Sequence, residues 1–242
     1  MALFSRQINQ RQRKRVKDVF MPEHPLASTV LIGVPTSSGC RLATETWLLV
    51  QAQRSFRVIY GMGSLSVEDS RTAIVAKFLA QKDFTHLLFI DSDVAPPMNL
   101  IEKLYAHDKA VMAGNYPLYI DGRIIASGYG FDKEKQSYKP LSFLANGMQR
   151  VYAIGLGCVL IRKEVLQKAV NYPCFQMRYG HDSKGHFKML DSEDITFSKV
   201  LTTLGFKIYM DFDQRCDHYK VLSLGGIIQD VQGGKLIYES PK

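Results

Sequence analysis

The sequence has no long hydrophobic run. None of its apolar stretches approaches the roughly 18 residues that a membrane-spanning helix needs. The first 20 residues contain no apolar block after their basic cluster, so they lack the pattern of a secretory signal peptide. Internal repeats, low-complexity segments and interdomain linkers are also absent from the 242 residues. We therefore predict a single-domain cytoplasmic protein without a transmembrane segment, long enough to bury one substantial core.

Cysteine is scarce and widely spaced. The four cysteines form no CxxC pair, and they are Cys40, Cys158, Cys174 and Cys216. A zinc site built from them would lack the usual short spacing, and disulfides are not expected in a reducing compartment. Free cysteine usually behaves as a small hydrophobic side chain, so we predict four buried or half-buried thiols.

Acidic residues are outnumbered by basic ones. The chain has 23 Asp and Glu against 31 Lys and Arg, which gives a net charge of +8. Residues 1–20 hold six of the basic residues and only one acidic residue, and so carry +5 of this charge. Such an arm binds nucleic acid, an anionic membrane surface, or only water. We predict a basic N-terminal arm over residues 1–25, a main domain over 26–220 and a C-terminal extension over 221–242.

Strand and helix patterns alternate through the first half of the chain. Strands are predicted over residues 28–36, 56–62, 86–90 and 109–117, and helices over residues 43–53, 66–83 and 96–108. Ser66 followed by Asp69 resembles a capping box at the start of the second helix, and two prolines start the third. This alternation is typical of an α/β fold, with a mostly parallel sheet covered on both faces by helices.

The second half of the chain is less regular. We predict a hairpin or long loop over residues 119–150, a strand and helix over 150–170, a helix over 191–205 and a half-exposed strand over 206–212. The strand predicted within residues 150–170 runs through Gly155 and Gly157. Asp191 or Ser192 caps the later helix, and Gly205 stops it.

The segment HLLFIDSDVAPP, residues 86–97, leads an apolar strand directly into two carboxylates, Asp91 and Asp93. In open α/β sheets ligands bind beyond the carboxyl ends of the strands. Two carboxylates separated by one residue can hold a hard divalent cation, which neutralises a diphosphate. In the alternative interpretation one Asp caps the next helix and the other faces water. Haloacid-dehalogenase-type phosphatases also have a DxD motif, but theirs ends the first strand and is not followed by Val94-Ala95, so we exclude them.

Two further groups of residues could take part in chemistry. Glu193 and Asp194 fall in the first turn of a predicted helix, where acids are common for helix-dipole reasons, but where a carboxylate could also accept a proton from an attacking hydroxyl. His218 follows the last regular strand, and a neutral imidazole could complete a cation site begun by Asp93, although a lone histidine is more often an ordinary hydrogen-bonded residue. The histidines in RYGHDSKGHF, residues 178–187, do not form a strong metal motif and are interpreted as substrate-loop residues.

Four features occur in a characteristic order. They are TAIVAKFLAQKDFTHLLFIDSDVAPP, AIGLGCVLIRKEVL, SEDITFSKVLTTLGFKIYMD and the late His218. Together they resemble nucleotide-sugar glycosyltransferases of the GT-A fold, of the family-2-like type found in phages and bacteria, over residues 28–220. The resemblance implies a single-domain GT-A fold, with a Rossmann-like, mostly parallel sheet flanked by helices and a small antiparallel portion on the acceptor side.

The resemblance also implies roles for the acidic residues. Asp91 contacts the nucleoside or ribose and lies at the metal, while Asp93 ligates the Mn²⁺ or Mg²⁺ that bridges the donor diphosphate. His218 is a further metal ligand. Asp194 is the catalytic base, with Glu193 as the nearest competitor.

The remaining implied roles concern substrate contacts. The donor residues are Pro35, Thr36 and Ser37 around the nucleobase, Arg71, and Ser92 between the two aspartates. Arg71 is usually followed by Asn in the family, whereas Thr72 follows it here, which departs from the pattern. The loop of Gly155, Leu156 and Gly157 lies beside the acceptor.

The predicted activity is metal-dependent transfer of a sugar from a nucleotide sugar, most simply a UDP-sugar, with inversion at the anomeric carbon. The favoured acceptor is a hydroxymethylated pyrimidine in phage DNA, because a +8 protein suits a polyanion and because the chain resembles enzymes with which viruses of bacteria glycosylate such bases. A phage-encoded enzyme would act in the host cytoplasm. The alternatives are a glycan or lipid-linked saccharide acceptor and, in another class, a non-catalytic nucleic-acid-binding module on the same fold.

Overall fold

Strands and helices alternate from the first described residues, as the sequence predicts. The computed structural model describes residues 23–61, 66–120, 122–181 and 184–220, so most of the predicted N-terminal arm and all of the predicted C-terminal extension lie outside the described residues. The first elements are β1 (Val30–Pro35), α2 (Leu42–Gln53), β2 (Val58–Gly61), α3 (Val67–Leu79), β3 (His86–Ile90), α4 (Leu100–Ala106) and β5 (Val111–Asn115).

The central sheet has seven strands in the order β10-β15-β5-β12-β3-β1-β2. Its later members are β10 (Met148–Val151), β12 (Cys158–Arg162) and β15 (Ile208–Arg215). Five strands run in one direction, because β1 is parallel to both β2 and β3, β15 is parallel to β5, and β12 is antiparallel to both β3 and β5. Only β12 and β10 run the other way. The predicted α/β class with a mostly parallel sheet is confirmed.

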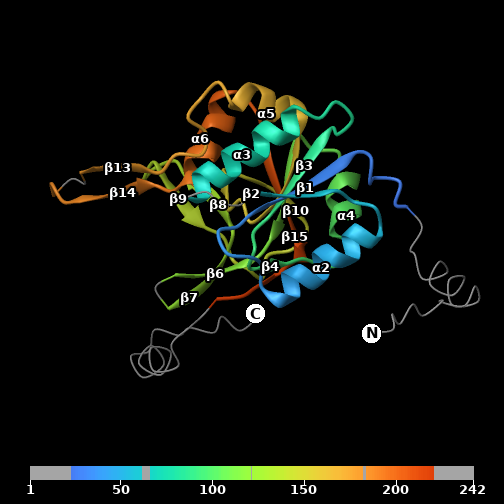
Figure 1. Ribbon diagram of the computed structural model, residues 1–242. Coiled ribbons are helices and arrows are strands. Elements are labelled where there is room, and N and C mark those ends of the chain that lie inside the picture. The colour runs from blue at the N-terminus through green and yellow to red at the C-terminus, as the bar shows by residue number, and fades with distance from the viewer. Residues whose placement is uncertain (1–22, 62–65, 121, 182–183, 221–242) are drawn as a thin grey trace, which may run out of the picture.

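Helices cover both faces of this sheet (Figure 1), and each face has its own apolar core. In β3, Leu87 and Phe89 face the core formed with α3, α5 (Lys163–Ala169) and α6 (Glu193–Thr203). The intervening Leu88 and Ile90 face the other core, formed with α2 and α4. Successive side chains of a strand point to opposite faces, so a continuous apolar run is what a strand buried on both sides requires.

The predicted helix ends agree with the structure at two helices. The Ser66 hydroxyl accepts a hydrogen bond from the Asp69 N–H at the start of α3, at 3.1 Å. Ser192, one of the two predicted caps, does the same for Ile195 at the start of α6. Gly205 lies just beyond α6 with φ of 80°. By contrast, α4 does not begin at the two prolines, as predicted, but at Leu100, and Asn99 is its N-cap residue.

The smaller antiparallel portion consists of several short ribbons. These are a three-stranded sheet of β8 (Gly128–Asp132), β9 (Ser137–Pro140) and β11 (Ala153–Ile154), and the pairs β6 (Pro117–Ile120) with β7 (Arg123–Ala126), β13 (Arg178–His181) with β14 (Phe187–Asp191), and β4 (Val94–Ala95) with β16 (Asp217–His218). The predicted hairpin or long loop over 119–150 is therefore mostly hairpin.

One predicted strand is wrong. The sequence predicts a single strand through Gly155 and Gly157, but the chain forms β11, leaves the regular structure over residues 155–157, and then enters the central sheet as β12. The interruption arises because β11 pairs with β8 in the small sheet whereas β12 pairs with β3 and β5. No helix in the described ranges is long and apolar enough to cross a bilayer.

Candidate active site

The loop between β11 and β12 lies directly against the end of β3. The Asp91 N–H donates to the Gly157 carbonyl at 3.0 Å, which continues the antiparallel pairing of Cys158 with Ile90. Neither Asp91 nor Asp93 caps the next helix, because Asn99 occupies that position. The DSD motif, residues 91–93, therefore lies at the carboxyl edge of the sheet, where ligands of open α/β sheets bind.

Arg71 of α3 gathers three carboxylates at this edge. Its Nη2 lies 3.0 Å from Asp91 Oδ1, 3.8 Å from Glu193 Oε1 and 4.0 Å from Asp194 Oδ1. Its Nη1 donates to the Leu156 carbonyl at 3.5 Å. Burial alone would lower the pKa of this guanidinium, but the three carboxylates outweigh that effect and raise it. Arg71 thus holds residues from β3, α6 and the 155–157 loop around one cation.

Arg71 is only 1% exposed. Direct contact with a donor, which the family resemblance implies for this residue, does not fit that burial. In this structure Arg71 contacts Asp91, Glu193, Asp194 and the Leu156 carbonyl, and its role in donor binding stays a prediction.

The two neighbouring acids of α6 differ in their surroundings. Asp194 is the more accessible, with 27% of its side chain exposed against 11% for Glu193. Its Oδ1 accepts a hydrogen bond from the Leu156 N–H at 3.2 Å. Burial raises the pKa of Asp194 to about 8, with Glu193 and Asp91 adding to the rise and Arg71 opposing it. A carboxylate with a raised pKa is a stronger proton acceptor near neutral pH.

Close packing explains the two glycines of the 155–157 loop. The Gly157 N–H donates to the Tyr116 hydroxyl at 3.1 Å. A Cβ on Gly157 would lie 2.8 Å from Asp91 Oδ2, and a Cβ on Gly155 would lie 2.9 Å from Tyr116 Cζ. Only glycine fits where the backbone approaches Asp91 and Tyr116 this closely. Burial, with Asp194 and Asp91 nearby, raises the pKa of the Tyr116 phenol well above its usual value.

Asp93 meets His218 through a short strand pair. The pairing of β16 with β4 sets His218 opposite Val94, and His218 Nε2 lies 3.5 Å from Asp93 Oδ1. The Lys220 ammonium donates to Asp93 Oδ2 at 2.6 Å. Burial opposes ionisation of Asp93, but the hydrogen bonds from His218 and Lys220 outweigh it and lower the pKa of Asp93 to about 2. Asp93 is therefore a permanent anion beside an imidazole.

The orientation of His218 suits a divalent cation. Its Nδ1 lies 2.7 Å from the Pro117 carbonyl, which can only accept, so Nδ1 carries the proton. The hydrogen bond from Nε2 to Asp93 forms when the imidazole carries a second proton. In the neutral imidazole Nε2 instead has a lone pair that a cation between it and Asp93 would bind, and a second-shell carbonyl of this kind typically orients metal-binding histidines. The residues fit a cation held by one carboxylate and one imidazole.

Asp91 does not join this pair. Its carboxylate is bound to Arg71, and within the residues that the structure describes no cluster of three or more His, Cys, Asp or Glu side chains is placed to hold a metal ion. That Asp91, Asp93 and His218 share one metal stays a prediction. Asp93 and His218 are adjacent, and Asp91 belongs to the Arg71 cluster.

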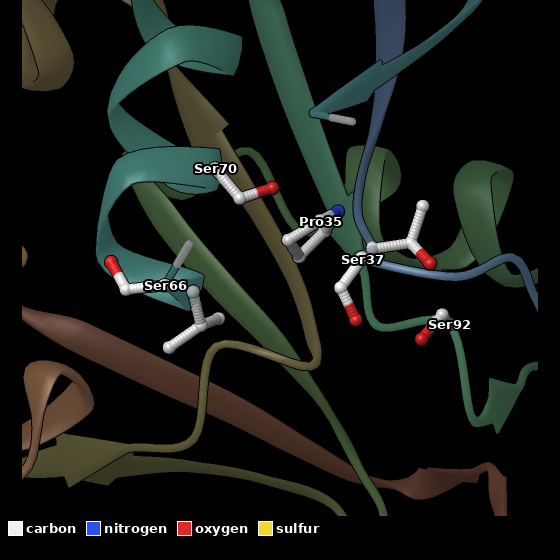
Figure 2. Close-up of a pocket in the computed structure, with 7 residues that line it drawn as sticks. Pro35, Ser37, Ser66, Ser70 and Ser92 are labelled. Carbon is white, nitrogen blue, oxygen red and sulfur yellow. The ribbon is translucent and has the colours of Figure 1, made fainter. Parts of the chain in front are cut away.

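A pocket of about 240 Å³ opens beside the DSD motif (Figure 2). Its lining includes four of the six predicted donor residues, Pro35, Thr36, Ser37 and Ser92, but not Arg71 or Asp91. The start of α3 adds Ser66, Val67 and Ser70. Hydroxyl groups can donate to or accept from the polar edge of a heterocycle or a ribose, while Pro35 and Val67 supply apolar contact.

Sequence reasoning missed four residues of this region. The sequence indicates Ser66 only as a helix cap, although it also lines the pocket, and no sequence pattern marks Ser70. Tyr116 follows the carboxyl end of β5, at the same edge of the sheet as Asp91, and that position is the signal that could have identified it. Lys220 follows His218 by two residues and gives no signal of its own.

The four cysteines are free thiols, of which Cys40 is half-buried and the other three are buried. This result confirms the prediction from their spacing. The sulfur atoms of Cys158 and Cys216 lie 3.6 Å apart at the base of the site.

Comparison with solved structures identifies the architecture. The chain aligns with the structure of GalNAc-T7 containing UDP, GalNAc and Mn²⁺, with a TM-score of 0.52 and 11% identity, over 86% of this chain and 48% of that one. The fold is GT-A-like. A197 from STIV aligns over 81% of this chain and 97% of its own, with 20% identity and a TM-score of 0.49. No family model matches the sequence, and no curated protein matches it.

The GT-A-like fold accounts for where these side chains meet. The chain spans about half the length of GalNAc-T7, and at 11% identity the likeness concerns the fold alone. In this fold the carboxyl ends of β1 and β3 carry the pocket and the DSD motif. The 155–157 loop then brings Asp194 to the same edge.

Proposed function

We propose that the protein transfers a sugar from a nucleoside diphosphate sugar to an acceptor hydroxyl. The observation that carries this proposal is the order of three groups along one sheet edge. A hydroxyl-lined pocket lies beside Ser92 of the DSD motif, and Asp93 of the same motif lies next to His218. Asp194 lies on the other side of the 155–157 loop. This order matches what the reaction needs, namely a nucleoside site, a site for the diphosphate charge, and a base.

Asp93 and His218 are the residues that would hold a divalent cation, Mn²⁺ or Mg²⁺. The cation stabilises the charge of the nucleoside diphosphate that departs. Lys220 lies on the other oxygen of Asp93, 2.6 Å away, and adds a further positive charge at this point. Asp91 remains with Arg71 and faces the 155–157 loop.

The pocket would receive the nucleoside. Pro35, Thr36, Ser37 and Ser92 line it together with two serines of α3, and none of these side chains is charged. A UDP-sugar is the first donor to test, because the structure of GalNAc-T7, which shares the fold, contains UDP and Mn²⁺.

Asp194 would act as the base. It is more exposed than Glu193 and faces the loop on which an acceptor would lie. When Asp194 accepts the proton of the acceptor hydroxyl, the oxygen attacks the anomeric carbon and the bond to the diphosphate breaks on the opposite side. Attack from the face opposite the leaving group inverts the anomeric centre.

We further propose that the acceptor is a hydroxymethylated pyrimidine in DNA and that the chain is of the family-2-like phage type. The net charge of +8 supports a polyanionic acceptor. A base in a duplex would have to leave the stack for its hydroxymethyl group to reach Asp194. A glycan or lipid-linked saccharide is the alternative acceptor of the same enzyme. The domain carrying the activity would comprise residues 26–220.

The test is a donor screen. Mn²⁺ is titrated into the full-length protein with a panel of nucleotide sugars, and binding and slow hydrolysis are recorded by calorimetry and nucleotide chromatography. We expect one nucleotide sugar to bind and to be hydrolysed only with metal present. The Asp93→Asn variant is the matched control, since it retains the fold and loses an anionic ligand. Absence of binding by the whole panel with Mn²⁺ present would disprove the proposal.

A further inference from the structure

The β13–β14 hairpin projects from the body of the molecule (Figure 1). Its strands pair Tyr179 with Met189 and His181 with Phe187. Residues two apart on a strand share a face, as do cross-strand partners, so these four side chains form one face of the ribbon, which we call the hairpin face. Leu190 belongs to the opposite face, where it packs against Gly180.

The hairpin face is aromatic and open to solvent. Phe187 is 69% exposed and Tyr179 is 57% exposed. Their rings lie parallel, with centroids 6.0 Å apart and an interplanar angle of 12°. Large apolar side chains that gather on an exposed face often mark an interaction site. Both rings are exposed, so a planar ring can stack on either of them.

The surroundings of the hairpin face are basic. Residues 176–191 contain Arg178, Lys184 and Lys188 against Asp182 and Asp191. Of these, Arg178 binds Asp191, and Lys188 pairs with Gly180 on the opposite face of the ribbon. The neighbouring β8–β9 hairpin reaches the base of β14, since the Lys199 ammonium lies over the Tyr138 ring at 6.0 Å and also binds Asp191. That hairpin exposes Lys133, Lys135 and Lys139.

The hairpin connects directly to the proposed base. β14 ends at Asp191, Ser192 caps α6, and Asp194 lies in the first turn of that helix. Phe187 is four residues from Asp191 in β14, which at about 3.3 Å per residue is about 13 Å. A ligand that touches both the hairpin face and Asp194 must therefore be several units long.

We infer that the hairpin face docks an unpaired stretch of nucleic acid and presents it to Asp194. Bases stack on exposed aromatic rings, and phosphates are attracted by the surrounding basic residues. An uncharged glycan could also stack on Tyr179 and Phe187, but it would gain nothing from the lysines. The role as acceptor dock rests on the proposed sugar transfer, whereas binding of the strand does not.

The test measures single-stranded DNA binding by fluorescence anisotropy. The full-length protein is titrated into a labelled oligonucleotide of about 12 nucleotides, a length within the range that single-strand sites cover. We expect Tyr179→Ala and Phe187→Ala each to weaken binding about 5- to 100-fold, because stacking on one ring contributes that much per base. Tyr179→Trp should retain the affinity, since the larger ring still stacks.

The matched control is Tyr172→Ala, which removes a tyrosine that is 43% exposed but lies outside the hairpin. It should leave oligonucleotide affinity unchanged. All variants should melt at the wild-type temperature and bind the nucleotide sugar with Mn²⁺ as the wild type does. If the hairpin variants lose oligonucleotide binding in a protein that binds no nucleotide sugar, the nucleic-acid surface stands and the proposed function fails.

Two other ligands serve as competing arms of the same experiment. Vesicles of phosphatidylcholine with phosphatidylserine test an anionic membrane, and an uncharged oligosaccharide tests a glycan. Unchanged oligonucleotide affinity in Tyr179→Ala and Phe187→Ala would overturn the inference. It would equally be overturned if the two variants impaired vesicle or oligosaccharide binding alone.

Discussion

At the scale of single residues, the Arg71 cluster contains more negative than positive charge. One buried guanidinium faces Asp91, Glu193 and Asp194, and its Nε has no hydrogen-bond partner among the described residues. Burial is the main cause of the raised pKa of Asp194, and the surplus negative charge of Glu193 and Asp91 adds to it. The repulsion among these carboxylates therefore helps to make Asp194 a proton acceptor.

The raised pKa of Asp194 sets the pH dependence of transfer. A base must be deprotonated to act, so kcat should rise with pH and level off above about 8. The measurement is kcat between pH 5.5 and 9.5 with saturating donor. Asp194→Asn should lose most of kcat with donor binding intact. Glu193→Gln should keep a kcat that rises with pH, with the midpoint shifted to lower pH because Glu193 helps to raise the pKa of Asp194. A slower Glu193→Gln than Asp194→Asn would reassign the base to Glu193.

Replacing Arg71 should be costly. Arg71→Met leaves buried carboxylates without their cation, and removing one partner of a buried pair typically costs about 3–5 kcal/mol. The raised folded-state pKa of Asp194 means that its contribution is lost as pH rises through about 8, so the loss should be larger at pH 8.5 than at pH 5.5.

Urea unfolding at those two pH values checks this expectation. Adding Asp194→Asn to Arg71→Met should recover part of the loss by removing one buried charge. Arg57→Met, at an exposed arginine that precedes β2, is the control and should change stability by no more than about 0.5 kcal/mol. Equal losses at both pH values would show that the Asp194 charge is not what Arg71 compensates.

Substitutions around Asp93 should move metal affinity in opposite directions. Asp93→Asn removes an anionic ligand and should weaken Mn²⁺ binding by tenfold or more, on the order of 1.4 kcal/mol or above. Lys220→Met removes a cation bound to the same carboxylate at 2.6 Å, so it should tighten Mn²⁺ binding in the absence of nucleotide. Calorimetry with Mn²⁺ alone measures both. Weaker binding in Lys220→Met would contradict competition for Asp93.

At the scale of elements, the break between β11 and β12 shapes the site. Because β12 enters the sheet antiparallel between β3 and β5, its first residues cross the edge where Asp91 emerges. The preceding loop therefore lies between Asp91 and Asp194 and contacts both, through the Gly157 carbonyl and the Leu156 N–H. A continuous strand could not supply these contacts.

Gly157→Ala should damage this element. The new Cβ would lie 2.8 Å from Asp91 Oδ2 and 2.9 Å from Tyr116 Cζ, and overpacking of this kind costs about 1–3 kcal/mol. We expect a lower melting temperature and a reduced kcat, because Asp91 must shift. Gly130→Ala is the matched control, since its Cβ would meet no atom closer than 3.5 Å. Wild-type stability and kcat in Gly157→Ala would show that the loop does not fix Asp91.

The sequence predicts local features of these elements better than their pairing. The caps at Ser66 and Ser192 are recognisable because a hydroxyl and an N–H three residues later form them within one turn. The apolar run of β3 is also recognisable from adjacent residues alone, and it indicates a strand buried on both faces. The partner of β12 depends on contacts with β3 and β5, which are distant in sequence, so no local pattern shows where the strand breaks.

Some residues of the candidate site can likewise be recognised from local sequence, and others cannot. Asp91, Asp93 and the acids of α6 are recognisable because each stands at the end of a strand or the start of a helix. Tyr116 reaches the site from β5 through its hydroxyl, and Lys220 through a side chain beyond β16. The position of Arg71 is detectable by resemblance, but its burial is a property of the packed α3 helix that the sequence does not display.

At the scale of the whole molecule, the charge distribution gives the last prediction. The protein carries +8, of which the predicted arm over residues 1–20 contributes +5, and these residues lie outside the described part of the structure. Cations that contact phosphates release counterions, and each contact contributes about 0.9 to the slope of log affinity against log salt. Duplex DNA binding should therefore weaken steeply with salt, and deletion of residues 1–20 should flatten the slope by several such increments. A variant with the arm sequence scrambled keeps the charge and should keep the slope. Undetectable binding at about 50 mM salt, where phosphate contacts are strong, would remove DNA as the acceptor and favour a saccharide.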